Sequence, residues 1–334
     1  MKAATFDHFG TPDQVLQITD RPKPVPARGE VLVRMIASPV NPSDLMYIEG
    51  RYGLQPKQWP ATPGFEGLGI VEATGGGLLG MLRKGKRVAV LNGGIGNWSE
   101  YTVTTARQVI PVPSDIPDEQ AATFFVNPAT ALGITRHVLC VPKNEWLLQS
   151  AAGSALGKMV IALGKKFGFR TINTVRRREQ VAELKALGAN EVLCESDGPI
   201  DEQVRKIVSG GVKYAMDPVG GATGSAVIRS LAEGGRCLMF GLLSGEPVTV
   251  DPRFLITGNK SVEGFWLGEW AKSQGVLKIL RLIRDVRSLM REGVLKTHIA
   301  EVYPLDRVAD AVRAAAQPGK AGKVLLDIGT MKRQ

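Results

Sequence analysis

A turn of small residues near the middle of the chain has the composition of a phosphate-binding site. It follows Glu145–Ser150, a short apolar run typical of a buried parallel strand. The three positions of the dinucleotide-binding fingerprint G-x-G-x-x-G are Ala152, Ser154 and Gly157 here. Alanine and serine are still small enough to admit a phosphate, which would face the N–H groups at the start of the next helix. A purely structural turn is the alternative interpretation.

Three consecutive arginines follow the next predicted strand, Arg170–Val175. A dinucleotide site commonly has an acidic residue here that bonds the ribose 2′-OH, and arginine where a 2′-phosphate is bound. This chain has Arg176, Arg177 and Arg178, with no acid before Glu179. The guanidinium fork suits phosphate, and cations at a helix start oppose the helix dipole unless an anion is present. We therefore predict NADPH as the cofactor; a solvated charge run is the alternative.

The elements that must position these residues alternate between strand and helix. The helix after the turn has apolar residues at helical spacing, and further strands are expected at 191–194, 214–217 and 236–241. Such alternation predicts a doubly wound parallel sheet. The first 120 residues are instead rich in strand-like runs, glycine and proline, which predicts a compact β domain. An amphipathic helix is expected over 277–290 and another helix over 306–316, and the last strand, Lys323–Ile328, is expected to return to the first domain.

Composition places the chain among ordinary globular proteins. It has 334 residues, of which 44% are hydrophobic and 22% charged, and this length favours two domains. Apolar runs are too short for a transmembrane helix, and Met1 leads directly into a strand-like run, so we expect a cytoplasmic protein without a targeting segment. The cysteines, Cys140, Cys194 and Cys237, are expected to be buried thiols. The net charge of +10 suits anionic ligands, while no module that reads nucleic acid is visible.

The whole chain resembles the medium-chain dehydrogenase/reductase superfamily. Layout and motifs both carry the resemblance; the motifs are Asn41-Pro42-Ser43-Asp44, Pro63-Gly64-Phe65-Glu66-Gly67, Gly96-Asn97-Trp98-Ser99-Glu100-Tyr101 and Asn127-Pro128-Ala129-Thr130-Ala131. The resemblance implies an α/β protein with a GroES-like β-barrel catalytic domain, residues 1–120 and 266–334. A Rossmann cofactor domain, a doubly wound parallel sheet, would span 121–265.

The zinc enzymes of this superfamily have a cysteine where Asn41 stands and a histidine where Phe65 stands. Neither residue can replace a thiolate or an imidazole ligand, and the cysteine-rich structural zinc lobe is missing. We therefore expect no metal.

Within the zinc-free branch, the chain looks most like the 2-enoyl thioester reductases and next like the quinone oxidoreductases. The former resemblance rests on the turn 152–157, the run 172–176, the pair Phe265-Trp266 and the loop 48–53, which has Tyr52 at the catalytic tyrosine position. A conjugated thioester accepts hydride at Cβ, and Cα must then receive a proton. A phenol remains protonated at neutral pH and can donate it. Tyr52 is therefore the candidate acid, Tyr47 is its competitor, and a packing role is the alternative for Tyr52.

The same resemblance implies a set of cofactor contacts. Asn127, with Thr130 nearby, should lie near the nicotinamide or the tyrosine, and the turn from Gly153 through Ser154, Ala155 and Leu156 to Gly157 should hold the pyrophosphate. Arg176 and Arg178 should meet the 2′-phosphate. Residues expected on the nicotinamide side of the cleft are Phe240, Gly241, Phe265, Trp266, Leu267 and Lys323. A purely structural role is the alternative for Phe265 and Trp266.

These inferences predict an NADPH-dependent, zinc-independent reductase of an activated C=C bond, with an enoyl thioester of coenzyme A or of a carrier protein as substrate. An NADPH:quinone oxidoreductase is the runner-up, and a protein that binds NADPH without catalysis is a third hypothesis. By family analogy we expect a homodimer that forms through the sheet edge near Lys260–Glu263.

Overall fold

The structure is a computed structural model that describes residues 1–93, 96–317, 319 and 322–332. The chain divides into two compact units. Unit 1 comprises Met1–Val126 and Thr297–Gln334, and unit 2 comprises Asn127–Lys296. Each unit is described by itself below.

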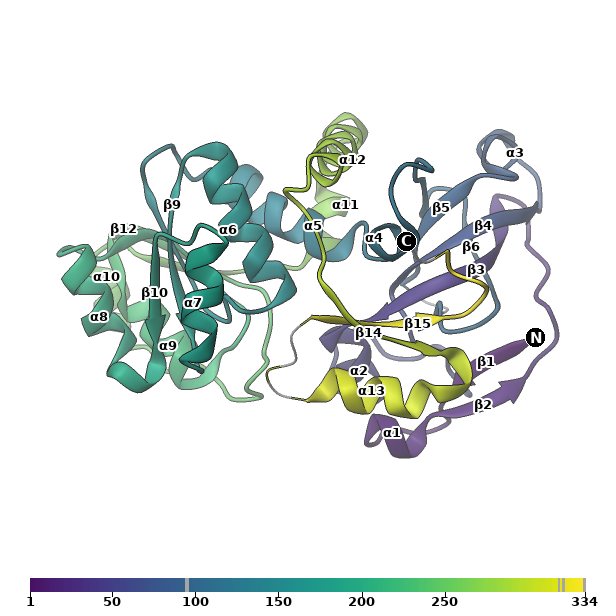
Figure 1. The fold of residues 1–334 in the computed structure, drawn as a ribbon, viewed down its shortest axis with the longest axis horizontal. Helices are drawn as coiled ribbons and strands as arrows, with labels where there is room; N and C mark the ends of the chain where they lie inside the picture. The colour runs from purple at the N-terminus through teal and green to yellow at the C-terminus, as the bar shows by residue number, and fades with distance from the viewer. Residues whose placement is uncertain (94–95, 318, 320–321, 333–334) are drawn as a thin grey trace. The chain divides into compact units, whose positions relative to one another are not determined.

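A seven-stranded sheet forms the centre of unit 1. Its order is β14-β15-β3-β4-β5-β7, and β6 also pairs with β3. The strands are β3 Glu30–Val40, β4 Glu66–Thr74, β5 Arg87–Leu91, β6 Tyr101–Thr105, β7 Val109–Pro111, β14 Ile299–Pro304 and β15 Lys323–Asp327. A separate pair joins β1, Lys2–Thr5, to β2, Gln17–Asp20. Antiparallel pairing of β15 with β3 confirms that the last predicted strand returns to the first domain (Figure 1).

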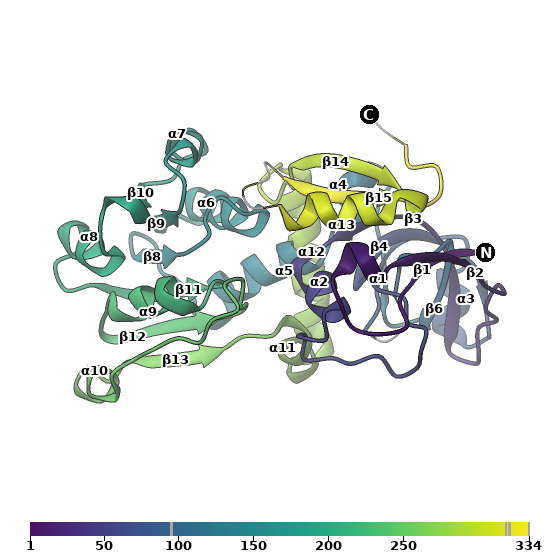
Figure 2. The same cartoon turned by 90° about the horizontal axis from the view of Figure 1, so that it is seen from below.

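Short helices cover this sheet. They are α1 Pro12–Val15, α2 Pro42–Ile48, α3 Leu78–Arg83, α4 Asp118–Ala122 and α13 Val308–Ala316. The helix α13 contacts both α1 and β15 (Figure 2). Its buried side chains, Val308, Ala311 and Val312, share one apolar core with Tyr47 of α2 and with Trp98. This core therefore joins the C-terminal helix to the segment that carries the candidate tyrosines.

Unit 2 contains a six-stranded sheet in which all pairings are parallel. Its order is β10-β9-β8-β11-β12-β13, with β8 Trp146–Gln149, β9 Arg170–Val175, β10 Glu191–Cys194, β11 Val212–Asp217, β12 Leu231–Met239 and β13 Ser261–Gly264. Counted within the sheet, this is the order 3-2-1-4-5-6 of the Rossmann fold, and the order reverses between β8 and β11. The predicted doubly wound sheet is confirmed.

Helices pack on both faces of this sheet, α6 and α7 on one side and α8 and α9 on the other. The helices of this part of the chain are α5 Val126–Leu132, α6 Ala155–Phe167, α7 Glu179–Ala186, α8 Ile200–Ile207, α9 Gly221–Arg229, α10 Pro252–Thr257, α11 Leu267–Ser273 and α12 Val276–Arg291. Ile161 of α6 and Leu184 of α7 pack with Val175 of β9. Val204 of α8 and Val227 of α9 pack with Ile172 of the same strand. Because Ile172 and Val175 are an odd number of residues apart, they face opposite sides of the sheet, as these two clusters require.

Two expectations from the sequence differ from the structure. Residues 266–296 lie in unit 2 and not with the β domain, because Phe265 and Trp270 pack close to Gly133 and because Lys166 bonds Glu292 at 2.5 Å. Cys140 is exposed and not buried. It comes after the π-helical turn Gly133–Val138, and its own backbone has a φ of 49°. Cys194 and Cys237 are buried as expected. None of the helices in the described residues combines the length and the apolar character needed to span a lipid bilayer.

Candidate active site and cofactor site

The small-residue turn joins β8 to the first turn of α6. The hydroxyl of Ser154 caps this helix by accepting the Gly157 N–H at 3.0 Å, which is the usual role of serine at an N-cap. A Cβ on Gly157 would stand 2.6 Å from backbone atoms of Ala152, so glycine alone fits there. The Ala152 N–H donates to Thr174 at 3.1 Å and ties the turn to β9. The helix start therefore stays close to the strand, with its first N–H groups outside the helical ladder.

Two buried amides beneath this turn were missed in the sequence analysis. Gln149 Nε2 donates to the Gly157 carbonyl at 3.0 Å and to Asn173 Oδ1 at 2.7 Å. Asn173 Nδ2 donates in turn to the Glu191 carbonyl at 2.8 Å. These bonds connect β8, β9 and β10 below the turn. An amide side chain in each of two strands expected to be buried was the available signal, because such a residue needs a buried partner.

All three arginines are exposed at the end of β9. Arg178 pairs with Asp197, and Arg176 lies directly after the last residue of the strand. Gln180 of α7 lies against Gly153, since its side chain would meet a Cβ there at 2.2 Å. Arg176 and the turn therefore follow the carboxyl ends of neighbouring parallel strands, which is where α/β sheets bind ligands.

The carboxyl ends of two more strands bring further residues to this edge. Phe240 and Gly241 follow β12, and Phe265, Trp266 and Leu267 follow β13. Phe265 is buried and packs on Trp270 with ring centroids 5.7 Å apart, whereas Trp266 is 39% exposed. Asn127 and Thr130 lie on α5, the first half-buried and the second buried. Topology therefore gathers the predicted cofactor residues that follow strands at one edge, while their contacts with a cofactor stay predictions.

At the point where the sheet order reverses, Asp217 ends β11. Ser150 donates its hydroxyl to Asp217 Oδ1. The other oxygen accepts the N–H groups of Val219 at 3.1 Å and Gly220 at 2.7 Å. Burial raises the pKa of this carboxyl, and these hydrogen bonds oppose the rise. Asp217 therefore shapes the turn that follows β11.

The two candidate tyrosines belong to unit 1 and have different surroundings. Tyr47 is 6% exposed and packs edge-to-face on Phe6 and Phe65, and burial raises the pKa of its phenol. Tyr52 is half-buried, with its ring 5.1 Å from the ring of Phe65. Its N–H donates to the Met46 carbonyl at 3.1 Å, which holds the loop against the end of α2. Tyr52 is thus the more accessible of the two phenols.

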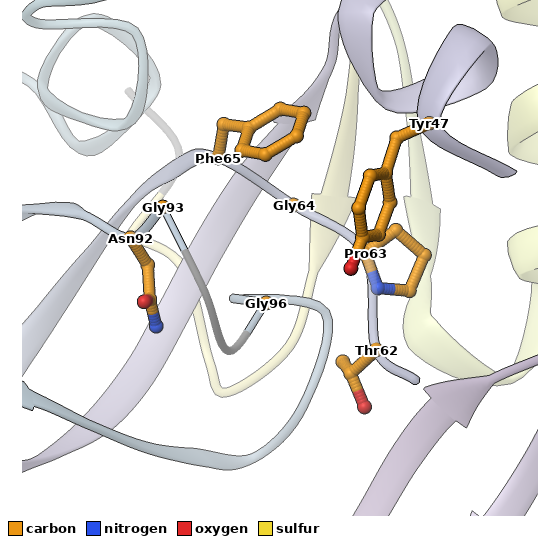
Figure 3. A pocket seen from close by; sticks show the side chains of 8 residues that line it. All are labelled: Tyr47, Thr62, Pro63, Gly64, Phe65, Asn92, Gly93 and Gly96. Carbon is orange, nitrogen blue, oxygen red and sulfur yellow. The ribbon is translucent and has the colours of Figure 1, made fainter. Parts of the chain in front are cut away.

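A small cavity of about 10 Å³ lies beside Tyr47. In Figure 3 the Tyr47 ring extends from α2 toward the segment 62–63. The lining residues are Tyr47, Thr62, Pro63, Gly64, Phe65, Asn92, Gly93 and Gly96. This volume matches about one water molecule, because a cavity of roughly 10–15 Å³ is the smallest that holds one. Tyr52 does not line it.

Four buried polar side chains form a network next to this region. Lys323 Nζ donates to Asn41 Oδ1 at 2.6 Å, and Asn41 Nδ2 donates to Glu66 Oε1 at 3.0 Å. Glu66 Oε2 accepts the Val126 N–H at 3.0 Å. Asp44 accepts the N–H groups of Asn41 at 2.7 Å and of Phe65 at 3.0 Å. All four side chains belong to residues that are at most 6% exposed.

Burial shifts the pKa values of the three ionisable side chains in this network. It raises the pKa of Asp44 to about 7, although the two backbone hydrogen bonds oppose the shift. It also raises the pKa of Glu66 and lowers that of Lys323, while the attraction between these two groups opposes both changes. From the sequence, Asn41 was expected only at the place of a lost zinc ligand, and Lys323 only on the nicotinamide side. The signal available was a lysine at the start of the last apolar strand, since a buried lysine requires a partner.

Asn41 and Phe65 therefore have defined structural roles of their own, one in the network and one between two tyrosine rings. In the described part of the chain, no group of three or more His, Cys, Asp or Glu side chains is placed to hold a metal ion.

Comparison with known proteins agrees with this architecture. Residues 27–114 match the family model described as alcohol dehydrogenase GroES-like domain, and residues 155–281 match the one described as zinc-binding dehydrogenase. The mitochondrial enoyl-[acyl-carrier-protein] reductase of Homo sapiens is 32% identical over 98% of this chain and 88% of its own length. A Bacillus thuringiensis structure assigned as an NADPH:quinone reductase is 33% identical, with a TM-score of 0.91 over 98% of this chain and 99% of that one.

A Rossmann domain joined to a GroES-like domain, with Asn41 and Phe65 at the zinc-ligand positions, defines a zinc-free dehydrogenase/reductase. The chain belongs to the zinc-free branch of the medium-chain dehydrogenase/reductase superfamily. A mycobacterial relative whose structure contains NADPH is 27% identical, with a TM-score of 0.89 over 98% of this chain and 100% of its own. The protein is accordingly an oxidoreductase that uses a nicotinamide dinucleotide and acts on a small molecule.

Proposed function

We propose that this protein is an NADPH-dependent reductase of 2-enoyl thioesters, with Tyr52 as the proton donor. The observation that carries the proposal is the similarity along 98% of the chain to relatives named enoyl-[acyl-carrier-protein] reductase, at 32–33% identity for the human and Bos taurus enzymes. The half-buried phenol of Tyr52 supports it, because a proton donor must reach a substrate that comes from solvent.

The residues of unit 2 suit the proposed cofactor. The start of α6 offers backbone N–H groups beside Gly157, where a larger residue would collide with Ala152. Arg176 offers an exposed guanidinium at the end of β9, suited to a 2′-phosphate. Bound NADPH would supply the hydride. The nicotinamide side is proposed for the residues that follow β12 and β13, together with Asn127 and Thr130.

Tyr52 would act at the other end of the reaction. Reduction at Cβ leaves negative charge on the thioester oxygen and basic character at Cα. The phenol would donate its proton there, and a hydrogen bond from it would stabilise the developing enolate. The Phe65 ring at 5.1 Å would keep the Tyr52 ring in one orientation. Tyr47 is enclosed by Phe6 and Phe65, so we assign it a packing role.

An NADPH:quinone oxidoreductase is the second candidate. The Bacillus thuringiensis structure with that assignment, 33% identical to this chain, favours it. A reduced quinone can take its protons from water, so this reaction needs no dedicated donor. The two candidates therefore differ in what they require of Tyr52.

The test is NADPH oxidation by purified wild-type and Tyr52→Phe protein, with crotonyl-CoA, a longer enoyl-CoA and 1,4-benzoquinone as acceptors. For the thioesters, we expect kcat of Tyr52→Phe to fall about 100-fold or more, in line with the loss of a general acid. Tyr47→Phe is the matched control and should keep kcat within about threefold, since Phe preserves the buried ring. Turnover of the quinone alone, equal in wild type and Tyr52→Phe, would establish the second candidate. No turnover with any acceptor would favour a protein that only binds NADPH.

The preference for NADPH over NADH has its own test. Arg176→Ala should raise KM for NADPH about tenfold and leave KM for NADH unchanged, because only NADPH carries the 2′-phosphate. Steady-state kinetics with both cofactors measure this directly. Equal KM changes for the two cofactors would remove Arg176 from the phosphate site.

A further inference from the structure

Lys323 contributes the one cation of the buried network in unit 1. It comes from β15, the strand that returns from the C-terminal part of the chain to pair with β3. Its ammonium does not bond a carboxylate directly in the described contacts; it donates to Asn41 Oδ1 at 2.6 Å. The Asn41 amide then donates to Glu66 at 3.0 Å. The amide thus stands between an ammonium and a carboxylate.

This arrangement sets the orientation of Asn41. Its oxygen must face the ammonium and its NH₂ must face the carboxylate. The reverse orientation would place the NH₂ against the ammonium, donor against donor, and the oxygen against the carboxylate, acceptor against acceptor. Hydrogen bonds polarise one another in a buried chain of this kind, and charged ends strengthen them. The hydrogen bonds at the two ends of this network therefore depend on each other, although Lys323 and Asn41 are 282 positions apart in sequence.

The far end of this chain of hydrogen bonds is the start of α5. Glu66 Oε2 accepts the N–H of Val126, the first residue of that helix, at 3.0 Å. A carboxylate is favoured at this position because the N-terminal end of a helix carries partial positive charge. The next residue is Asn127, which we propose near the nicotinamide or the tyrosine. A second branch leads from the Asn41 N–H through Asp44 to the Phe65 N–H, and Phe65 packs on Tyr52.

We propose that Lys323 is a positioning residue for the reaction, which acts through Asn41 and Glu66 to hold the first turn of α5 and the segment that supports Tyr52. The inference rests on the proposed function, and it replaces the expectation that Lys323 contacts the cofactor itself. Removing the ammonium would leave Asn41 Oδ1 without its donor and Glu66 without its balancing charge. The carboxyl would then hold a proton more readily, because the charge of Lys323 opposes the rise of its pKa. Its bond to the Val126 N–H would weaken accordingly, because neutral acceptors are weaker than charged ones.

The experiment compares wild type with Lys323→Met, Glu66→Gln and the double variant, using whichever acceptor the wild type reduces. We expect kcat to fall by up to about 100-fold in each single variant, which is the loss that a misplacement near 1 Å can cause, with KM for NADPH changed less than about twofold. The double variant should lose less than the product of the two single losses, since coupled groups are not additive. Lys84→Met, which removes an exposed charge from the same unit, is the control and should match wild type.

Amide hydrogen exchange provides a readout that does not depend on the acceptor. The Val126 N–H should exchange faster in Lys323→Met and in Glu66→Gln than in wild type, with folding checked by thermal unfolding. Glu66→Gln keeps the shape of the side chain, and it therefore tests the positioning role if Lys323→Met does not fold. Failure of wild type to reduce any acceptor would refute the proposed function alone, while the exchange data would still test the network. A raised KM for NADPH at unchanged kcat, or Val126 exchange equal to wild type, would overturn the positioning role.

Discussion

Asp44 shows how the interior of unit 1 changes the chemistry of one residue. Its carboxyl is fully buried and has backbone N–H groups on both oxygens, at 2.7 Å and 3.0 Å. Burial outweighs these bonds and raises its pKa from 3.8 to about 7. The folded protein therefore keeps this proton at pH values where the unfolded chain has released it.

The raised pKa of Asp44 predicts a pH dependence of stability. A carboxyl with a higher pKa in the folded state stabilises the fold fully below its unfolded pKa of 3.8, and this contribution is lost as the pH rises to about 7. Asp44→Asn removes the titration. Thermal unfolding between pH 5 and pH 8 should show wild type losing more stability than Asp44→Asn over that interval, by an amount on the order of 1–3 kcal/mol. Parallel curves for the two proteins would show that Asp44 does not titrate in this range.

At the scale of elements, the junction of β8 with α6 depends on backbone contact. Ser154 caps the helix, the Ala152 N–H bonds β9, and Gly157 lies against Ala152. A glycine at this position serves the close approach of helix to strand. The buried bond from Gln149 to the Gly157 carbonyl, at 3.0 Å, holds the same turn from below.

Gly157→Ala should separate α6 from β8. A Cβ at 2.6 Å from backbone atoms forces the helix start to move, and we expect a loss of about 1–3 kcal/mol in the free energy of unfolding, as for other overpacked sites. The dissociation constant for NADPH should rise about tenfold or more, measured by fluorescence titration. Gly275→Ala is the control, because its Cβ would meet nothing within 4 Å and its φ of −66° suits alanine. Equal affinity in both variants would contradict the role of the turn.

At the scale of the whole molecule, β13 is an edge strand of the sheet in unit 2. It pairs only with β12 in the sheet order, and Arg236 of β12 bonds Glu263 of β13 with two contacts of 2.9 Å. An edge strand presents unpaired backbone groups that another chain can bond. Two copies related by a twofold axis would bring the same edge together from both sides.

We therefore propose a homodimer formed through β13. Size-exclusion chromatography with light scattering should give about twice the chain mass of 35.9 kDa, and hydrogen exchange along Ser261–Gly264 should slow as the protein concentration rises. The strand β10, at the other edge, is the internal control and should not change. A monomer at all concentrations would remove this proposal.

Local pattern was enough to predict most elements of unit 2. The strand Arg170–Val175 was predicted with the bounds that the structure shows, because a run rich in β-branched residues ended at three charged residues. The edge that collects Gly157, Arg176, Phe240 and Phe265 follows from strand order alone, since parallel strands present their carboxyl ends on one side. In unit 1, short elements such as α3 and β7 were missed, because a run of three to six residues shows too little periodicity to predict them.

The sequence by itself determined the class of the protein, because side-chain periodicity and motif spacing are local properties of the chain. The tertiary structure alone decided which polar groups meet. Lys323 and Asn41 come together because β15 pairs with β3, and Glu66 reaches Val126 across 60 positions. The tertiary structure also decided that Tyr47 is buried and that Cys140 is exposed. Burial and partnership depend on contacts between distant segments, which no local pattern contains.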